Sequence, residues 1–223
     1  MNHVNEIDVN VTVRRVLISV SNKSGLPELV ETLITLPDVQ IVSTGGTYKK
    51  IAEILGQKRE ERLIRVSSYT GQPEMQGGLV KTLDFKIYLG LLSEPYNTDH
   101  DSDRARMAAE LIDMVVVNLY PFAEIISNPE CDAEDARSNI DIGGPTMLRA
   151  AAKSYLRVVP LCNPADYPTV CDELRENGGT VSYQTRLKLA KKAFAHTAEY
   201  ERVIADYFDS LSSESARAPY TLH

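Results

Sequence analysis

Cysteine and histidine are scarce in this sequence, and neither shows the spacing of a metal site. The 223 residues include three cysteines, Cys131, Cys162 and Cys171, and four scattered histidines. An odd number of cysteines without a C-x-x-C pair indicates neither a disulfide framework nor a zinc site. His196 lies within a helical pattern, and we interpret it as packed or exposed rather than catalytic. A reducing cytoplasm is the compartment we expect.

Long apolar runs and an excess of positive charge are also missing. No segment approaches the roughly 20 apolar residues of a transmembrane helix, and the N-terminus has no basic region followed by a long apolar run. The net charge of −7 and the isoelectric point near 5.2 disfavour a general nucleic-acid binder, because phosphate backbones need a positive surface. We therefore expect neither a membrane nor a nucleic acid as partner, and an anionic ligand needs a local cationic pocket.

The sequence does contain an alternation of apolar runs and amphipathic segments. Runs typical of strands buried in a parallel sheet lie at 13–20, 39–43, 63–66, 113–119 and 157–162. Helical spacing of apolar residues occurs at 26–36, 48–55, 103–111, 133–139, 145–153, 163–177 and 182–211. We read segment 84–92 as a strand or a buried loop and segment 93–103 as turn-rich. The alternation predicts an α/β fold, a mostly parallel sheet with flanking helices and a C-terminal helical extension.

The length fits one sizeable domain. We predict a single domain over 13–211, in which 13–162 form the α/β core and 163–211 the helical extension. The ends, 1–12 and 212–223, are expected to be flexible.

Two polar loops follow the first two predicted strands. One runs from Ser19 to Ser24, and the other is Thr44-Gly45-Gly46-Thr47 at the start of a predicted helix. Hydroxyl groups and free backbone amides at a helix start are suitable phosphate ligands. The second loop alone equally fits an ordinary turn and helix cap. Because ligands of open parallel sheets bind beyond the carboxyl ends of strands, the two loops together favour an anion site.

The stretch 139–153 combines an acid, two glycines and two cations. Asp141 precedes a Gly-Gly-Pro sequence that starts a helix, so free helical amides point back toward it. The alternative is an ordinary helix start with an acid near its positive end and solvated cations further along. The three alanines that follow let the helix pack closely, so we expect Lys153 to lie near other elements. This setting favours a functional site.

Three more residues are candidates for the site because of their positions in the predicted fold. Asn118 and Tyr120 follow the most apolar strand, where a parallel sheet places site residues, although Tyr120 also fits a core cap with its hydroxyl in water. Lys81, beside Thr82, closes a long glycine-containing loop at 67–81. Such loops are often functional, while an ordinary surface lysine is the alternative.

Several motifs, taken in order, point to one known family. SVSNKSGL resembles that family's SVSDKTGL, STGGT its phosphate loop, and TGQPEM its TGFPEM. VVVNLYPF and IDIGGPTMLRAAAK match almost letter for letter, and KLAKKAFAHTAEY is similar to its C-terminal helical segment. The chain thus resembles IMP cyclohydrolase, the N-terminal half of a bifunctional purine-synthesis protein that also carries an aminoimidazole carboxamide ribonucleotide transformylase. This resemblance implies a methylglyoxal-synthase-like fold with a helical extension.

The resemblance also implies a reaction and its residues. The carboxamide nitrogen of formylated aminoimidazole carboxamide ribonucleotide attacks the formyl carbon and water leaves, without metal or redox cofactor. The implied catalytic residues are Lys81, Tyr120, Asp141 and Lys153. The implied substrate-binding residues, chiefly phosphate ligands, are Ser19, Ser21, Lys23, Ser24, Thr44, Gly45, Gly46, Thr47, Thr82, Asn118, Gly143 and Gly144.

These residue types suit the reaction. We expect Asp141 to accept the amide proton, with Lys153 beside it to keep the carboxylate ionised. Lys81, Tyr120 and the backbone around Asn118 are expected to stabilise the charge that develops on the formyl oxygen.

Segment 79–90 departs from the family pattern. Where the family usually has Arg-Val-Lys-Thr-Leu-His-Pro-Lys-Ile-His-Gly-Gly, this chain has LVKTLDFKIYLG. An arginine is lost, and the added carboxylate of Asp84 would repel a phosphate if it faced the pocket. The alternatives to an active enzyme are a purine-nucleotide-binding or regulatory module with lost or altered activity, and a methylglyoxal-synthase-like lyase. Retention of all four catalytic candidates favours the cyclohydrolase.

Two partners are implied by the same resemblance. The family forms homodimers, so we expect a homodimer in which the extension and the site are shared between subunits. The transformylase half is not in this sequence, so a separate transformylase chain is expected to supply the formylated substrate.

Overall fold

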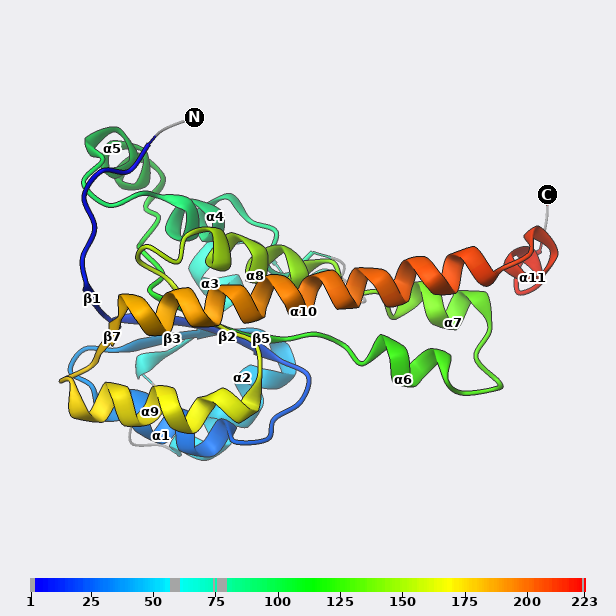
Figure 1. Ribbon diagram of the computed structural model, residues 1–223, viewed down its shortest axis with the longest axis horizontal. Coiled ribbons are helices and arrows are strands. Elements are labelled where there is room, and N and C mark those ends of the chain that lie inside the picture. The colour runs from blue at the N-terminus through cyan, green and yellow to red at the C-terminus, as the bar shows by residue number, and fades with distance from the viewer. Residues whose placement is uncertain (1–2, 57–60, 74, 76–79, 222) are drawn as a thin grey trace.

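A five-stranded parallel sheet forms the centre of the fold (Figure 1). The computed structural model describes residues 3–56, 61–73, 75, 80–221 and 223. The strand order is β4-β3-β2-β5-β6, and every neighbouring pair is parallel. The strands are β2 Arg15–Val20, β3 Gln40–Ser43, β4 Leu63–Arg65, β5 Met114–Asn118 and β6 Val159–Leu161. The predicted α/β fold is confirmed, since each apolar run contains one of these strands.

The strand order reverses at β2. The chain adds β3 and β4 on one side of β2 and then returns to add β5 and β6 on the other side. In parallel sheets with such a reversal, ligands bind in the crevice outside the carboxyl ends of the two strands where it occurs. The segments after β2 and β5 therefore flank the expected ligand position.

Helices cover both faces of the sheet (Figure 1). Val16 and Ile18 of β2 are buried against one set of helices, and Leu17 against the other, because successive strand side chains point to opposite faces. The first face carries α1 Leu26–Thr35, α2 Gly45–Leu55 and α9 Tyr167–Glu176. The second carries α3 Val66–Thr70, α4 Phe85–Leu92, α8 Gly143–Lys153 and α10 Tyr183–Ser210. Both faces of the sheet are therefore shielded from water.

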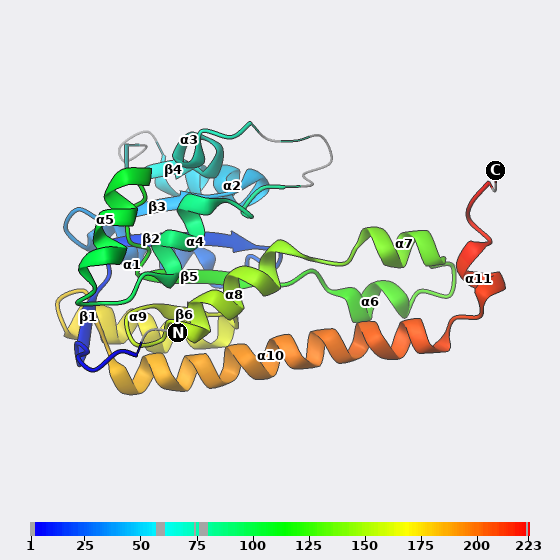
Figure 2. The same cartoon turned by 90° about the horizontal axis from the view of Figure 1, so that it is seen from above.

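A helical arm, residues 122–138, extends beyond the sheet together with the C-terminal half of α10 (Figure 2). The arm contains α6 Phe122–Ile126 and α7 Ala133–Ser138. Phe122 makes edge-to-face contacts with two tyrosines of α10, at centroid distances of 6.3 Å to Tyr200 and 5.8 Å to Tyr207. Beyond α10, α11 (Ser213–Arg217) contacts α7, and the Tyr220 hydroxyl donates to Glu134. These contacts fix the arm to α10.

The extension and the chain ends differ from their predicted limits. Helix α9 packs on α1 over the sheet, so the predicted extension 163–211 begins with a piece of the core, and only the second half of α10 extends outward. At the N-terminus, β1 (Asn10–Thr12) pairs antiparallel with β7 (Thr180–Ser182). The buried Arg186 guanidinium donates to the carbonyl oxygens of Asp8 at 2.8 Å and Val9 at 3.3 Å. Both ends that were expected to be flexible therefore contain regular structure: β1 lies within 1–12 and α11 within 212–223.

Segment 84–92 is a helix, α4, and not a strand or a loop. Asp84 caps it, because its carboxylate accepts a hydrogen bond from the Lys86 amide at 2.8 Å. The reading of segment 93–103 as turn-rich holds for 93–97, which contain a turn, but α5 (Thr98–Met107) begins within the segment. The Asn97 side chain caps this helix by accepting hydrogen bonds from the Asp99 and His100 amides. Part of the predicted loop at 67–81 is helix α3. Side-chain caps start α4 and α5, whereas the sequence prediction used apolar spacing.

Among the described residues, no helix combines the length and the apolarity needed to cross a membrane.

Candidate functional site

A cleft of about 820 Å³ opens at the carboxyl edge of the sheet. It lies where the strand order reverses, between the segments that follow β2, β3 and β5. Every residue predicted for the site lines this cleft except Ser24 and Lys153. Segments far apart in sequence are thus brought to one place, while the roles of the individual residues stay predictions.

The loops that follow β2 and β3 form the hydroxyl-rich side of the cleft. They are hydrogen-bonded to each other, since the hydroxyl oxygens of Ser19 and Thr44 are 2.9 Å apart. No side chain caps the start of α2, and a Cβ added at Gly45 or Gly46 would meet nothing within 4 Å. The amides of this helix start are therefore reachable by an anion, and the helix dipole favours negative charge there.

Thr47 and Asn118 hold the loops in shape. The Thr47 hydroxyl accepts from the Val20 amide and donates to the Val20 carbonyl, both at 3.1 Å. The side-chain oxygen Oδ1 of Asn118 accepts hydrogen bonds from the Ser21 amide at 2.6 Å and the Asn22 amide at 2.9 Å. Its side-chain nitrogen Nδ2 donates to the Asn22 backbone carbonyl at 2.8 Å. Because these groups already bond the backbone, both residues shape the anion loop more than they offer free donors to a ligand.

Asp141 lies half-buried in the cleft at the start of α8. Its carboxylate accepts a hydrogen bond from the Gly144 amide at 2.9 Å. Burial raises the pKa of Asp141, while the amides of Gly144, Tyr120 and Gly143 and the charge of Lys81 partly offset that rise. The net pKa is above the ordinary value. A carboxylate with a raised pKa inside a cleft is a strong candidate for proton transfer.

Gly143 and Gly144 leave room for neighbouring side chains as well as for a ligand. A Cβ at Gly144 would clash with the Asp141 carboxylate and lie 2.9 Å from Leu119 Cδ2. A Cβ at Gly143 would lie 2.8 Å from the Thr82 hydroxyl. Glycine is therefore required for Asp141 and Thr82 to approach the start of α8.

Lys153 is not beside Asp141. It lies in the last turn of α8, nine residues beyond Gly144, or about 14 Å along the helix axis at the usual rise. The alanines before it are buried as predicted, yet Lys153 itself is exposed. The expectation that Lys153 fixes the charge of Asp141 within one chain is therefore wrong, and Lys81 is the cation whose charge acts on Asp141.

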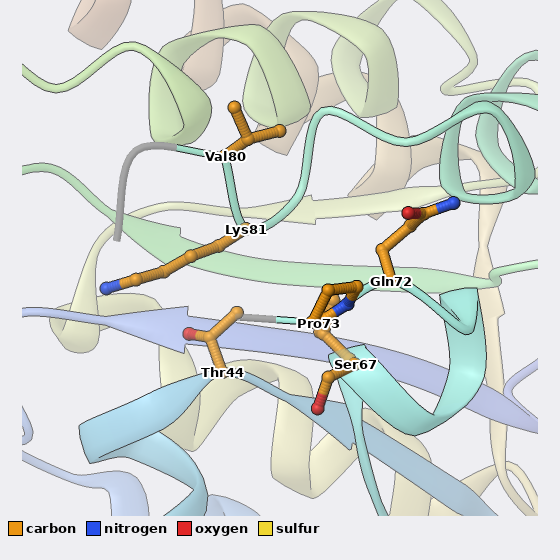
Figure 3. Close-up of a pocket in the computed structure, with 7 residues that line it drawn as sticks. Thr44, Ser67, Gln72, Pro73, Val80 and Lys81 are labelled. Atoms are coloured by element: carbon orange, nitrogen blue, oxygen red, sulfur yellow. The ribbon is translucent and has the colours of Figure 1, made fainter. Parts of the chain in front are cut away.

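Lys81 lies between the cleft and a small pocket of about 10 Å³. Figure 3 shows this pocket, in which the extended Lys81 side chain and the Thr44 hydroxyl point to the same side. The small pocket is lined by Thr44, Val66, Ser67, Gln72, Pro73, Val80 and Lys81. The lysine thus joins the hydroxyl-rich side of the cleft to the side that holds Asp141.

The divergent segment 79–90 shapes one wall without adding a carboxylate to the cleft. Leu79 lies outside the described residues, whereas Lys81, Thr82 and Leu83 line the cleft. The Asp84 carboxylate caps α4, and Asp84 is not among the residues that line the cleft. Tyr88 packs in the core, where burial raises its pKa to about 12.

Arg137 is a cleft residue that the sequence analysis missed. It lies in the last turn of α7, and Glu134 holds its guanidinium through two hydrogen bonds of 2.7 Å and 2.6 Å. With Lys23 and Lys81 it makes the cleft cationic in a chain of net charge −7. Its closeness in sequence to Asp141 was the available signal. No group of three or more histidine, cysteine or acidic residues suited to a metal occurs in the part of the chain that the structure describes.

Comparisons with known proteins agree with this architecture. Residues 25–146 match the family model of the MGS-like domain, and residues 151–223 match that of the AICARFT/IMPCHase bienzyme. The solved structure titled "Crystal structure of ForH" superposes with a TM-score of 0.77 at 32% identity, covering 88% of this chain and 97% of that one. The class is therefore an MGS-like α/β domain with a helical extension.

The sequence relatives narrow this class. The bifunctional purine biosynthesis protein PurH of Neisseria meningitidis serogroup A is 45% identical over 203 residues, which is 91% of this chain and 37% of the relative. PurH of Chlorobium phaeobacteroides is 46% identical over 204 residues, covering 92% and 38%. This chain belongs to the MGS-like domain family and is of the IMP cyclohydrolase type found in PurH. It spans less than two-fifths of the length of these curated relatives.

Proposed function

We propose that this chain is an IMP cyclohydrolase, which closes the purine ring of formylated aminoimidazole carboxamide ribonucleotide in purine biosynthesis. One observation carries the proposal: Asp141, with a raised pKa, lies in the same cationic cleft as Lys81 and a phosphate-type loop. The identity with PurH proteins supports the substrate class.

The substrate phosphate is proposed to bind the hydroxyl-rich side of the cleft. Ser19, Thr44 and the free amides of Gly45 and Gly46 supply neutral donors, and Lys23 supplies a charge near the start of α1. Neutral and charged donors at helix starts are the usual ligands of a phosphate. The heterocycle then extends toward Asp141 and Tyr120.

Ring closure moves two protons onto the formyl oxygen, one from the carboxamide nitrogen and one from the formamide nitrogen, and removes that oxygen as water. The carboxamide nitrogen attacks the formyl carbon, a C–N bond forms, and Asp141 accepts the amide proton. Lys81 and Tyr120 donate hydrogen bonds to the former formyl oxygen. The C–O bond then breaks as a C=N bond forms to the formamide nitrogen, which loses its proton, and the oxygen leaves as water with the two protons released by the two nitrogens. Holding the two groups in attack geometry supplies much of the rate, since well-oriented intramolecular reactions gain about 7–11 kcal/mol.

A homodimer with a shared site accounts for Lys153. Within one chain the exposed Lys153 lies at the far end of α8 from Asp141, so we propose that it acts in the site of a second copy. Mixing inactive Asp141→Asn and Lys153→Ala proteins tests this, because a mixed dimer then contains one intact site. Recovery of up to about a quarter of the wild-type rate supports sharing across a twofold dimer. No recovery contradicts it, as does full activity of Lys153→Ala alone.

A nucleotide-binding module without turnover is the second candidate. The rebuilt segment 79–90 and the distance between Lys153 and Asp141 favour it. Such a module needs the phosphate loops but no base.

The two candidates separate in one experiment. Purified protein is mixed with the formylated ribonucleotide, and purine absorbance is followed beside a calorimetric binding measurement. Turnover that is lost in Asp141→Asn and Lys81→Ala supports the cyclohydrolase. Binding without turnover at any enzyme concentration rejects it and supports the module.

A further inference from the structure

We propose that Tyr200 of helix α10 is a positioning residue for Asp141, so that the long helix is part of the support of the active site. This inference rests on the proposed function for its catalytic meaning. Its starting observation is a hydrogen bond between residues 59 positions apart: the Asp141 amide donates to the Tyr200 hydroxyl at 2.8 Å.

Asp141 is held at both of its ends. Its carboxylate is fixed by the Gly144 amide at 2.9 Å, and its backbone amide is fixed by Tyr200. The segment between α7 and α8 has no regular structure, so these bonds set where the carboxylate lies. A side chain held from both directions loses little freedom before reaction, which is what a base in attack geometry needs.

Tyr200 also contacts the other segment that enters the cleft. Its buried ring packs edge-to-face against Phe122, which is itself 1% exposed. The Phe122 amide donates to the Tyr120 carbonyl at 2.8 Å, and Tyr120 lines the cleft. One side chain of α10 therefore supports both Tyr120 and Asp141, which enter the cleft from different directions.

The Tyr200 hydroxyl stays neutral over the pH range in which Asp141 acts. Burial raises the pKa of Tyr200, and the hydrogen bond from the Asp141 amide and the Asp141 charge, which act in opposite directions, leave it raised. A neutral hydroxyl keeps accepting from the Asp141 amide at every pH at which the carboxylate acts. The support therefore does not titrate, and the acid limb of activity belongs to Asp141.

The chain offers a matched control on the same helix. Tyr207 also packs edge-to-face on Phe122, but its hydroxyl lies 3.4 Å from the Asp132 carbonyl in an exposed position. Tyr200→Phe and Tyr207→Phe both keep the ring and remove one hydroxyl. Only the first removes the bond to Asp141.

The test compares the two variants in the full chain by turnover and by hydrogen exchange. We expect Tyr200→Phe to lower kcat by roughly tenfold to a hundredfold with KM nearly unchanged, because small misplacement of a reacting group costs about that much. Exchange in a peptide covering 139–145 should speed up in Tyr200→Phe alone. Wild-type kcat in Tyr200→Phe, or equal losses in both variants, overturns the proposal.

Failure of the proposed function remains distinguishable from failure of this inference. If the wild type does not close the ring, the cyclohydrolase proposal is rejected and the exchange comparison decides the positioning claim alone. Faster exchange at 139–145 confined to Tyr200→Phe then supports it. Unchanged exchange overturns it.

Discussion

Replacement of Asp141 by asparagine is the most informative single change. Asparagine keeps a side-chain oxygen that can accept from the Gly144 amide, 2.9 Å from the present carboxylate, so the start of α8 should keep its geometry. It cannot accept the amide proton of the substrate. General-base catalysis contributes about 10²–10⁴ in rate, or about 3–5 kcal/mol of barrier, and kcat of Asp141→Asn should fall by that factor.

The pH profile gives the same prediction a second test. The base must be ionised, and burial raises the pKa of Asp141, so activity should decline with falling pH at a higher pH than an ordinary aspartate gives. The residual activity of Asp141→Asn should lack this limb. Asp206→Asn, which changes an exposed carboxylate of α10, is the control and should keep both rate and profile.

The raised pKa of Asp141 also predicts how the stability of the protein depends on pH. Because the folded pKa of Asp141 is raised, the folded state holds its proton more tightly than the unfolded state, and wild-type stability falls as pH rises through the folded pKa. Asparagine does not titrate, so this contribution to the pH dependence of stability is absent in Asp141→Asn. The free energy of unfolding of Asp141→Asn relative to wild type should therefore rise with pH across that range in urea titrations. A relative stability that falls with pH would refute the reasoning, since it would mean that the amides and Lys81 outweigh burial.

Four further predictions follow from other contacts. Arg137→Gln should raise KM about tenfold or more with kcat largely kept, because a charged donor to an anion contributes about 1.5–3 kcal/mol, while Arg106→Gln on α5 should have no effect in the same kinetic assay. Lys23→Ala should likewise raise KM more than it lowers kcat, which a substrate titration measures. Asp84→Ala should destabilise the fold by about 1 kcal/mol in urea unfolding and leave substrate affinity unchanged, because its carboxylate caps α4; tighter binding would place it in the cleft. Arg186→Leu should lower the free energy of unfolding by at least about 3 kcal/mol, because it removes a buried guanidinium that donates to several backbone carbonyl groups; a midpoint near wild type contradicts this.

The sheet could be predicted because its strands are uniformly apolar. All five residues of β5 are buried, and a run buried on both faces has few other uses in a chain of this length. The cleft could be predicted because motifs such as Thr44 to Thr47 follow strands, and parallel strands bring their carboxyl ends together. Both inferences use local sequence and one general rule of topology.

The failures concern contacts that no local pattern encodes. Apolar spacing did not identify α4, because its start depends on the single cap at Asp84. Lys153 faces solvent because the alanines before it, and not the lysine, supply the packed side of α8. Arg186 reaches backbone carbonyls some 178 positions away, and only the folded chain reveals that such a buried cation orders the N-terminus. Tyr200 fitted an apolar helix pattern equally well without its bond to Asp141.

Ring closure itself is the most direct test of the account. The purified chain is mixed with formylated aminoimidazole carboxamide ribonucleotide, and the appearance of the purine chromophore is recorded for wild type, Asp141→Asn and Asp206→Asn. The account predicts turnover in the wild type and in Asp206→Asn, and a loss of at least about a hundredfold in Asp141→Asn. Equal turnover in all three proteins, or none in the wild type despite tight binding of the ribonucleotide, would contradict it.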